Sequence, residues 1–346
     1  MRTAYKKVLT VVGCAAVLGT LVSAAPAVQA GAAPGELKVS VQAPQAVAGS
    51  ASTRAAAGCS PGENRYNRTQ SCIKASSKVD IIRNGRLEGT IRFAITQAVQ
   101  LHTGSRDFSE KYTFKVTGIA GRASAVTAAL DVACPGSCRA TNHVRGPRAV
   151  RAGTVISGPV NYHESTTTLH RDQVKYTLTF RKPGYSTSVS NWKSLTFRCD
   201  KGNKASKTGN FGTGCVFPGY DPTEVRQAAL PEIAKNISRI QKAGPHHYGA
   251  YALHGSPLHR TISTAERRAN RRIACKGHGT PPRQKSCDEY PFASTKEGAA
   301  NKKGKPGDWG WDWVPVSEQD QQRDILRDFY RENRILGGDR FWVAVP

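Results

Sequence analysis

The sequence predicts an α+β protein in which an all-β, sandwich-like domain precedes a small domain of mixed helices and strands. Three observations predict this fold class. Apolar residues alternate with polar ones from Cys59 to about Tyr220, which is typical of half-buried strands. After Pro218 the apolar residues recur at helical spacing instead. Nine cysteines in a chain that begins with an export leader favour disulfide cross-links.

Residues 1–30 are predicted to be a signal peptide. Basic residues open the chain, residues 8–25 are almost all apolar or small, and residues 28–30 offer a small-residue cleavage site. A single membrane anchor is the alternative, but no charged stop-transfer residues follow. A lipoprotein site at Cys14 would have too short an apolar core before it. We therefore expect a secreted, extracellular protein with no membrane span in its mature form.

Residues 31–57 are predicted to be a disordered linker or pro-segment. They are rich in Ala, Gly, Pro and Ser and contain few large apolar residues. Such a composition buries too little apolar surface to offset the entropy lost on ordering.

Residues 58–221 are predicted to form the β-rich domain, whose role the sequence does not reveal. The clearest alternating runs are Ile91/Phe93/Ile95, Tyr112/Phe114/Val116 and Val174/Tyr176/Leu178/Phe180. Asn84-Gly85 stands between two apolar runs and predicts a tight hairpin. Several short strands separated by turn residues favour a β-sandwich of roughly 150 residues.

Without Cys14, eight of the nine cysteines remain in the mature chain, and an even number in an exported protein predicts disulfides. The candidates are Cys59, Cys72, Cys134, Cys138, Cys199, Cys215, Cys275 and Cys287. The simplest pairing joins sequence neighbours: 59 with 72, 134 with 138, 199 with 215, and 275 with 287. A zinc site at Cys275, His278 and Cys287 is the alternative, although a second close Cys or His pair is lacking.

Residues 222–346 are predicted to form the second domain. Pro231 opens a helix with isoleucines at helical spacing, and Gly244 ends it. Ser263 and Glu266 form a capping-box pair before a helix that runs to about Ala274.

A last helix and a closing strand complete this domain. Ser317 with Asp320 is predicted to cap the helix, and its apolar side consists of Ile325, Leu326, Phe329 and Tyr330. Gly337 stops the helix, and residues 341–345 are predicted to form the strand.

The charge of the chain favours a polyanionic partner. Fifty Lys and Arg stand against 25 Asp and Glu, which gives a formal net charge of +25. Nucleic acid, anionic cell-wall polymers and membrane headgroups all fit, but no basic helix rich in Trp or Leu supports a membrane surface. Plain solubility is the alternative explanation.

One basic cluster is more specific. Arg267, Arg268, Arg271 and Arg272 are spaced to lie on one face of a helix. Guanidinium groups match phosphate oxygens in bidentate fashion, so this cluster is a candidate DNA-binding surface. A solvated helix face, paired with nearby acidic residues, is the alternative.

Residues 287–298 concentrate carboxylates in this basic chain. Asp288 and Glu289 are adjacent, and Glu297 follows a Tyr-Pro turn. Carboxylate oxygens are ligands for Mg²⁺, which polarises a phosphoryl oxygen, and one carboxylate could act as general base. In extended backbone the two adjacent carboxylates point to opposite sides. Ordinary surface acids are the alternative.

The segment 287–298 resembles the NucA/NucB family of secreted deoxyribonucleases, whose members carry an Asp-Glu-aromatic-Pro segment followed by Glu-Gly. Residues 257–260, 314–322, 329–330 and 338–343 also resemble the family's layout, in order and spacing. The resemblance covers about residues 230–346 and leaves the β-rich part untouched. It implies a compact, non-specific endonuclease of the ββα-metal type, which acts on DNA with a divalent metal, Mg²⁺ or Mn²⁺.

The resemblance also implies roles for individual residues. Asp288 is the leading catalytic candidate, as general base or metal-linked acid. Its companion Glu289 supports it, and Glu297 and His259 are further catalytic candidates. The metal ligands are expected among Asp288, Glu318 and Gln319.

This chain departs from the family pattern near the last helix. Gln319 stands where the family usually has Asn, and Gln322-Arg323 stands near the usual Gln-Gly pair. Glu297 is followed by Gly298-Ala299 rather than by two glycines.

The sequence therefore predicts a secreted, metal-dependent, non-specific endonuclease that hydrolyses phosphodiester bonds of extracellular DNA. Two alternatives stay open. One is a non-catalytic, secreted polyanion- or DNA-binding protein with a degenerate nuclease domain, and the other is an antibacterial nuclease toxin. No protein partner is predicted.

Overall fold

The computed structural model describes residues 35–40, 65–141, 146–165, 168–202, 212–220, 224–301 and 304–346. Residues Pro34–Pro346 form one compact unit. The predicted signal peptide lies outside the described residues. Within the described ranges, no helix is long and apolar enough to cross a membrane.

The predicted α+β class is confirmed. The N-terminal part is made of strands β1 (Glu36–Ser40), β2 (Arg65–Tyr66), β3 (Gln70–Arg83), β4 (Arg86–Gln100), β5 (Asp107–Gly121), β6 (Thr127–Ala133), β7 (Cys138–Thr141), β8 (Arg148–Ala149), β9 (Val155–Glu164), β10 (His170–Asp172), β11 (Lys175–Arg181), β12 (Ser188–Lys193), β13 (Phe197–Asp200) and β14 (Gly214–Val216). The C-terminal part consists of β15 (Val225–Arg226), α1 (Pro231–Ala243), η1 (Tyr251–Leu253), β16 (Leu258–His259), α2 (Thr264–Cys275), β17 (Lys285–Tyr290), β18 (Gly310–Pro315), α3 (Val316–Glu332), β19 (Arg340–Phe341) and β20 (Val343–Ala344).

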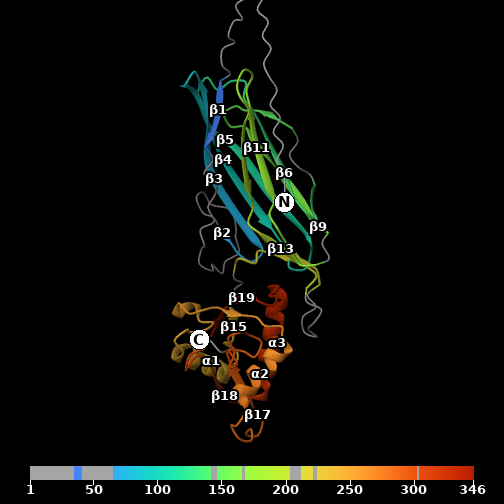
Figure 1. Ribbon diagram of the computed structural model, residues 1–346, viewed down its shortest axis with the longest axis vertical. Coiled ribbons are helices and arrows are strands. Elements are labelled where there is room, and N and C mark those ends of the chain that lie inside the picture. Colours follow the sequence, from blue (N-terminus) through green and yellow to red (C-terminus); the bar gives the residue numbers. More distant parts are fainter. Residues whose placement is uncertain are drawn as a thin grey trace, which may run out of the picture. The chain divides into compact units, whose positions relative to one another are not determined.

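The described strands of the N-terminal part form three antiparallel sheets. The largest has the order β1-β3-β4-β5-β9-β7, with β2 also paired to β3. A second sheet has the order β12-β11-β6-β8, and β10-β13-β14 form a third. Figure 1 shows the long strands β3, β4 and β5 side by side. Sequential strands are mostly neighbours, as expected when short turns join antiparallel strands.

The two larger sheets share one hydrophobic core. Phe93 of β4 and Phe114 of β5 both contact Phe180 of β11, with ring centroids 5.5 and 6.0 Å apart. The inward residues of β4, β5 and β11 alternate with more exposed ones along each strand. The period-two pattern therefore predicted both the strands and their buried faces.

The predicted hairpin at Asn84-Gly85 joins β3 to β4. Asn84 has φ 49° and Gly85 has φ 72°, both in the left-handed region that this residue pair tolerates. Arg83 pairs with Arg86 across the turn, so the loop has two residues.

The prediction of disorder is wrong for one short segment of residues 31–57. Glu36–Ser40 form β1, which pairs with β3 from Glu36↔Ile82 to Ser40↔Lys78. Leu37 is buried in the core. This burial stabilises the strand, and the composition of the segment did not indicate it. Most of the predicted linker lies outside the described residues.

Disulfides join sequence neighbours, as predicted. The described bonds are Cys134–Cys138, Cys199–Cys215 and Cys275–Cys287. Cys72 is also disulfide-bonded, whereas Cys59 lies outside the described residues. The Cys275–Cys287 bond connects the end of α2 to β17 and excludes zinc coordination by those two sulfurs as free thiolates.

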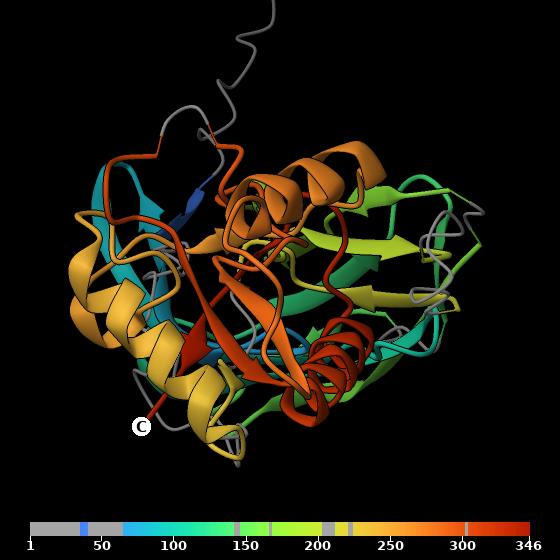
Figure 2. The same cartoon turned by 90° about the horizontal axis from the view of Figure 1, so that it is seen from below.

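The C-terminal part is built around the β17–β18 hairpin, and Figure 2 shows this hairpin among the three helices. A second hydrophobic core lies here, with Ile237 of α1, Tyr290 of β17 and Phe329 of α3 among its members. The predicted cap of α2 is present, because the Ser263 side chain accepts a hydrogen bond from the Glu266 backbone N–H at 3.3 Å.

Two details of the last elements differ from prediction. The helix α3 starts at Val316, directly after Pro315, and no side chain caps it. Ser317 lies inside the first turn, so its predicted capping role is wrong. The predicted closing strand is two short strands, β19 and β20, separated by Trp342.

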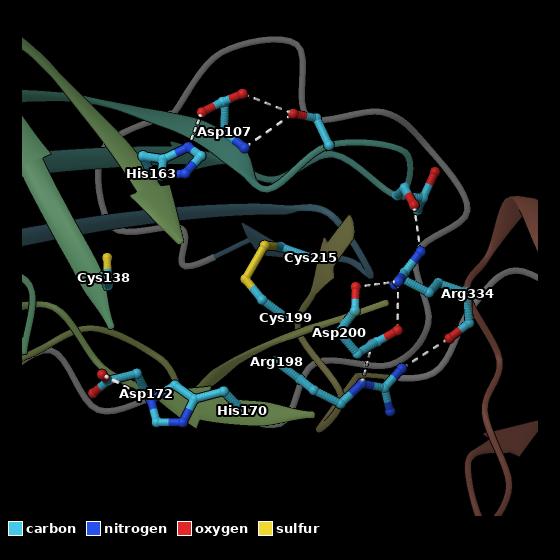
Figure 3. Close-up of a disulfide and its surroundings, with 12 residues drawn as sticks. Asp107, Cys138, His163, His170, Asp172, Arg198, Cys199, Asp200, Cys215 and Arg334 are labelled. Atoms are coloured by element: carbon cyan, nitrogen blue, oxygen red, sulfur yellow. Dashed lines mark hydrogen bonds and ion pairs between the residues drawn. A yellow bond between two sulfur atoms is a disulfide. The ribbon is translucent and has the colours of Figure 1, made fainter. Parts of the chain in front are cut away.

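A buried charge cluster joins the β-rich part to the segment after α3. Asp339 accepts hydrogen bonds from Arg68 at 2.5 Å and from Arg198 at 2.7 and 2.9 Å. Arg334 donates to the Asp200 side chain and, at 2.8 Å, to the Thr103 carbonyl. Figure 3 shows Arg334 and Asp200 beside the Cys199–Cys215 disulfide. Burial raises the pKa of Asp339, but the two guanidiniums outweigh it and hold that pKa below its ordinary value.

A second buried acid lies inside the β-rich core. Glu110 of β5 is 1 % exposed and accepts hydrogen bonds from Tyr162 at 2.6 Å, from Tyr176 at 2.8 Å and from Gln97 at 3.1 Å. Gln97 in turn accepts one from Trp192 at 3.1 Å. Burial nevertheless raises the pKa of Glu110 from 4.5 to about 7.

We expect Glu110 to make the folding free energy depend on pH. The pKa of Glu110 in the folded state lies above its unfolded value. Its contribution to the free energy of unfolding is therefore complete below about pH 4.5 and declines as pH rises to about 7. This pKa difference corresponds to roughly 3 kcal/mol. Urea unfolding between pH 4.5 and 7.5 measures the slope. Glu110→Gln is expected to flatten it, and an unchanged slope would contradict the assignment.

We expect Asp339→Ala to destabilise the protein by roughly 3–5 kcal/mol, because Arg68 and Arg198 would remain buried without a counter-charge. The matched control is Asp320→Ala, whose exposed ion pair with Arg323 should contribute about 0–1 kcal/mol. Urea unfolding measures both. Equal effects of the two variants would show that the buried cluster does not stabilise the fold.

Candidate active site

The two adjacent carboxylates lie on opposite faces of the β17–β18 hairpin. Asp288 pairs with Asp312 and Glu289 pairs with Trp311 across the antiparallel register. Successive residues of a strand point to opposite faces, so the two carboxylates have different surroundings.

Asp288 lies between α1 and α3 and is 1 % exposed. Its Oδ2 accepts a hydrogen bond from Asn236 Nδ2 at 2.9 Å, and its Oδ1 accepts one from Gln319 Nε2 at 2.7 Å. Burial raises the pKa of Asp288 to about 7, against the hydrogen bonds from Asn236 and Gln322, and the charge of Glu289 adds to the increase. The carboxyl group therefore exchanges its proton near neutral pH.

Glu289 faces α2 instead. Its Oε2 accepts a hydrogen bond from Arg271 Nη1 at 3.0 Å and lies 3.6 Å from Cys275 Sγ. Burial raises the pKa of Glu289, although Arg271 opposes this increase. The disulfide from Cys275 to Cys287 connects α2 to the strand next to this carboxylate.

A cavity of about 650 Å³ lies between α2, α3 and β17. Glu289, Gln319 and Gln322 line it. The cationic residues that line it are Arg260, Arg267, Arg271, Arg323 and Arg327. The cavity thus brings together one buried carboxylate, two side-chain amides and a set of guanidinium groups from separate elements.

The charge of this cavity distinguishes it from a larger one. A cavity of about 740 Å³ lies between β15 and another face of α3, and four acidic residues line it. These are Glu224, Asp324, Asp328 and Glu332. Such a lining repels phosphate, so the smaller, arginine-lined cavity is the candidate active site.

Glu297 and His259, both predicted catalytic residues, lie together but are not among the residues that line the cavity. Glu297 Oε2 accepts a hydrogen bond from the His259 backbone N–H at 2.8 Å, and its Oε1 lies 2.8 Å from His259 Nδ1. This pair connects β16 to the segment after the Tyr-Pro turn. Its contacts are those of a structural link.

Glu318 of α3, predicted as a metal ligand, directs its side chain to the start of α1. Its Oε2 accepts hydrogen bonds from the backbone N–H groups of Glu232 at 3.1 Å and Ile233 at 3.0 Å. These are unpaired donors of the first helical turn, which a carboxylate stabilises. Glu318 therefore caps α1, whereas the neighbouring Gln319 points to Asp288 and the cavity.

The four predicted DNA-binding arginines divide into two pairs. All four are exposed on α2, but only Arg267 and Arg271 line the cavity. The helical spacing placed all four on one broad face, but the packing of α2 against β17 directs only one pair into the cavity.

Sequence reasoning missed Asn236 and the cationic side of α3. Asn236 is fully buried on the apolar side of α1, between Ile233 and Ile240. A single amide on the apolar face of a predicted helix is the sequence signal that could have identified it. Arg323 and Arg327 follow an i, i+4 spacing that would have placed them on one helix face.

The residues in and beside the cavity fit a hard divalent cation. Glu289 offers carboxylate oxygens, and Gln319 and Gln322 offer amide oxygens, which are ligand types that Mg²⁺ and Mn²⁺ accept. Gln319 uses its Nε2 to donate to Asp288, so its Oε1 is not needed for that bond. The cavity thus offers oxygen donors of the types that a divalent cation accepts, and the buried carboxyl group of Asp288, whose pKa burial raises to about 7, lies beside Gln319.

No curated protein matches the chain. Residues 252–344 match the family model of deoxyribonuclease NucA/NucB. This segment contains α2, the hairpin, α3 and all the residues that line the cavity, whereas Asn236 and α1 precede it. The C-terminal region of the chain therefore carries a match to the NucA/NucB deoxyribonuclease family.

Proposed function

We propose that this protein is an exported, metal-dependent, non-specific endonuclease that hydrolyses DNA in the arginine-lined cavity. One observation carries the proposal: within the matched family segment, a single cavity combines the buried carboxylate Glu289, the amide of Gln319 and arginines from two helices. A ββα-metal arrangement of β17, β18 and α3 is part of this proposal.

Asp288 is proposed as the general base. A base works best when its pKa lies near the working pH, and burial raises the pKa of Asp288 to about 7. Gln319 lies between Asp288 and the cavity and donates to Asp288 Oδ1. Substrate binding is proposed to move the Gln319 amide away from Asp288. Asp288 Oδ1 can then accept a proton from the attacking water.

Glu289, Gln319 and Gln322 are proposed to hold the divalent metal. When bound, the metal would act as a Lewis acid on the phosphoryl oxygen and stabilise the leaving oxygen. Arg271 lies 3.0 Å from Glu289 and balances its charge before the metal binds.

The arginines are proposed to bind backbone phosphates. Arg267 and Arg271 come from α2, and Arg323 and Arg327 come from α3, so the two sets lie on different walls of the cavity. Phosphate contacts fix the register of DNA but carry no sequence information, which agrees with a non-specific enzyme.

Non-catalytic DNA binding remains the second candidate, and one observation favours it. Both oxygens of Asp288 accept hydrogen bonds from amides, and the residue is 1 % exposed. If Gln319 does not move, the carboxylate cannot reach a water molecule, whereas the arginines would still bind phosphate.

Export to an oxidising compartment is proposed from the disulfides. Structural disulfides persist in secreted proteins, and the described ones join Cys134–Cys138, Cys199–Cys215 and Cys275–Cys287.

We expect the protein to nick supercoiled plasmid with Mg²⁺ or Mn²⁺ and to stop when EDTA removes the metal. Asp288→Asn should lower the rate by about 10²- to 10⁴-fold, because the amide cannot accept the proton. The wild-type rate should rise with pH through about 7, as the base ionises. The matched control is Asp131→Asn, at an exposed position of β6 in the β-rich part, which should retain activity. DNA binding without cleavage in the wild type would support the second candidate instead.

We expect the two arginine pairs of α2 to differ in their effect on DNA affinity. Replacing Arg267 and Arg271 with Gln should weaken binding and reduce the salt dependence by roughly one phosphate contact per residue. Replacing Arg268 and Arg272, which do not line the cavity, should change the affinity and its salt dependence less. Fluorescence anisotropy over a salt series, with EDTA present, measures the slopes. Equal slopes for the two double variants would contradict the cavity as the phosphate site.

A further inference from the structure

Two tryptophans lie on the same face of the hairpin as Glu289. Trp311 pairs with Glu289 and Trp313 pairs with Cys287 across the β17–β18 register. Directly opposed residues share a face of the sheet, so the rings lie beside the carboxylate that lines the cavity.

The two faces of the hairpin are buried to different extents. Tyr290 and Val314, on the opposite face, belong to the second hydrophobic core. Trp311 and Trp313 are only partly buried and are not members of that core. The domain thus leaves part of two large aromatic surfaces in contact with water, which is more often a feature of a binding surface than of a core.

Ring contacts hold the tryptophans in place. Trp311 stacks on His278, with ring centroids 3.6 Å apart and an interplanar angle of 22°. His278 is itself fixed by a contact of 2.9 Å between its Nε2 and the Ala274 carbonyl at the end of α2. Trp313 meets Trp311 edge-on at 5.3 Å. A pre-ordered aromatic surface loses little conformational entropy when it binds a flat ligand.

Two cations from neighbouring elements, Arg239 of α1 and Lys285 of β17, contact the backbone of β18. Arg239 donates to the Trp311 carbonyl at 2.9 Å, and Lys285 donates to the Trp313 carbonyl at 3.3 Å. The exposed acid between the two rings, Asp312, points to the other face. Aromatic rings bordered by cations are the combination that binds single-stranded nucleic acid, in which bases stack on the rings and phosphates meet the cations.

We propose that Trp311 and Trp313 form a stacking platform for an unpaired base of a DNA strand whose phosphates enter the arginine-lined cavity. This inference rests on the proposed function and defines its substrate class. Bases in an intact duplex already stack on their neighbours, so the platform selects single-stranded, frayed or gapped DNA. Stacking tolerates every base, which agrees with low sequence specificity.

The test measures binding of a fluorescein-labelled DNA strand of about 12 nucleotides, the length that such sites cover, by anisotropy in EDTA. Trp311→Ala is expected to weaken binding roughly 5- to 100-fold. Trp311→Phe keeps a stacking ring and should bind within a few-fold of the wild type. Circular dichroism melting of each variant checks that it is folded.

A strand with abasic sites at its centre supplies the matched ligand control, because it keeps the phosphates and loses the bases. Wild type and Trp311→Ala should bind it with the same affinity. Equal losses on both strands, or unchanged binding by Trp311→Ala, would overturn the platform. If the wild type cleaves neither plasmid nor single-stranded DNA with Mg²⁺ or Mn²⁺ but the difference between the two strands persists, the proposed nuclease function fails while the platform is supported.

Discussion

The pairing of β17 with β18 is the constraint on which the candidate site depends. This two-stranded register places Asp288 toward α1 and α3, and Glu289 toward α2. A shift of one residue would exchange these faces and leave each carboxylate beside the wrong helix. The disulfide from Cys275 to Cys287 connects α2 to β17 and opposes such a shift.

Burial of charge is the second theme of the structure, with two different outcomes. Asp339 has two guanidiniums as partners, which outweigh the effect of burial on its pKa, so it is a charged link between the β-rich part and the segment after α3. Asp288 has only amide partners, and burial raises its pKa. Cationic partners lower the pKa of a buried carboxyl group, whereas burial among neutral partners raises it. The same physical cost of burial thus serves structure in one place and the proposed chemistry in the other.

Much of the fold was predictable because it follows from local patterns. The Asn84-Gly85 turn, the Ser263 cap of α2 and the pairing of Cys275 with Cys287 depend on residues close in sequence. The strand β1 was missed because its stability comes from pairing with β3 and burial of Leu37, which the composition of residues 31–57 does not reveal. The cap of α3 was misplaced because Ser317 and Asp320 fit the capping pattern, whereas the helix already begins at Val316, one residue before Ser317.

The sequence by itself determined the β-rich fold of the first part, the helices of the second, the neighbouring disulfides and the match to the NucA/NucB deoxyribonuclease family, since each is encoded in short-range pattern or motif. Only the tertiary structure decided which candidate residues meet. It placed Glu318 at the start of α1, joined Glu297 to His259, and directed Arg271 rather than Arg272 into the cavity. The reason is that side-chain direction depends on how α1, α2 and α3 pack around one hairpin, and these contacts join residues far apart in the sequence.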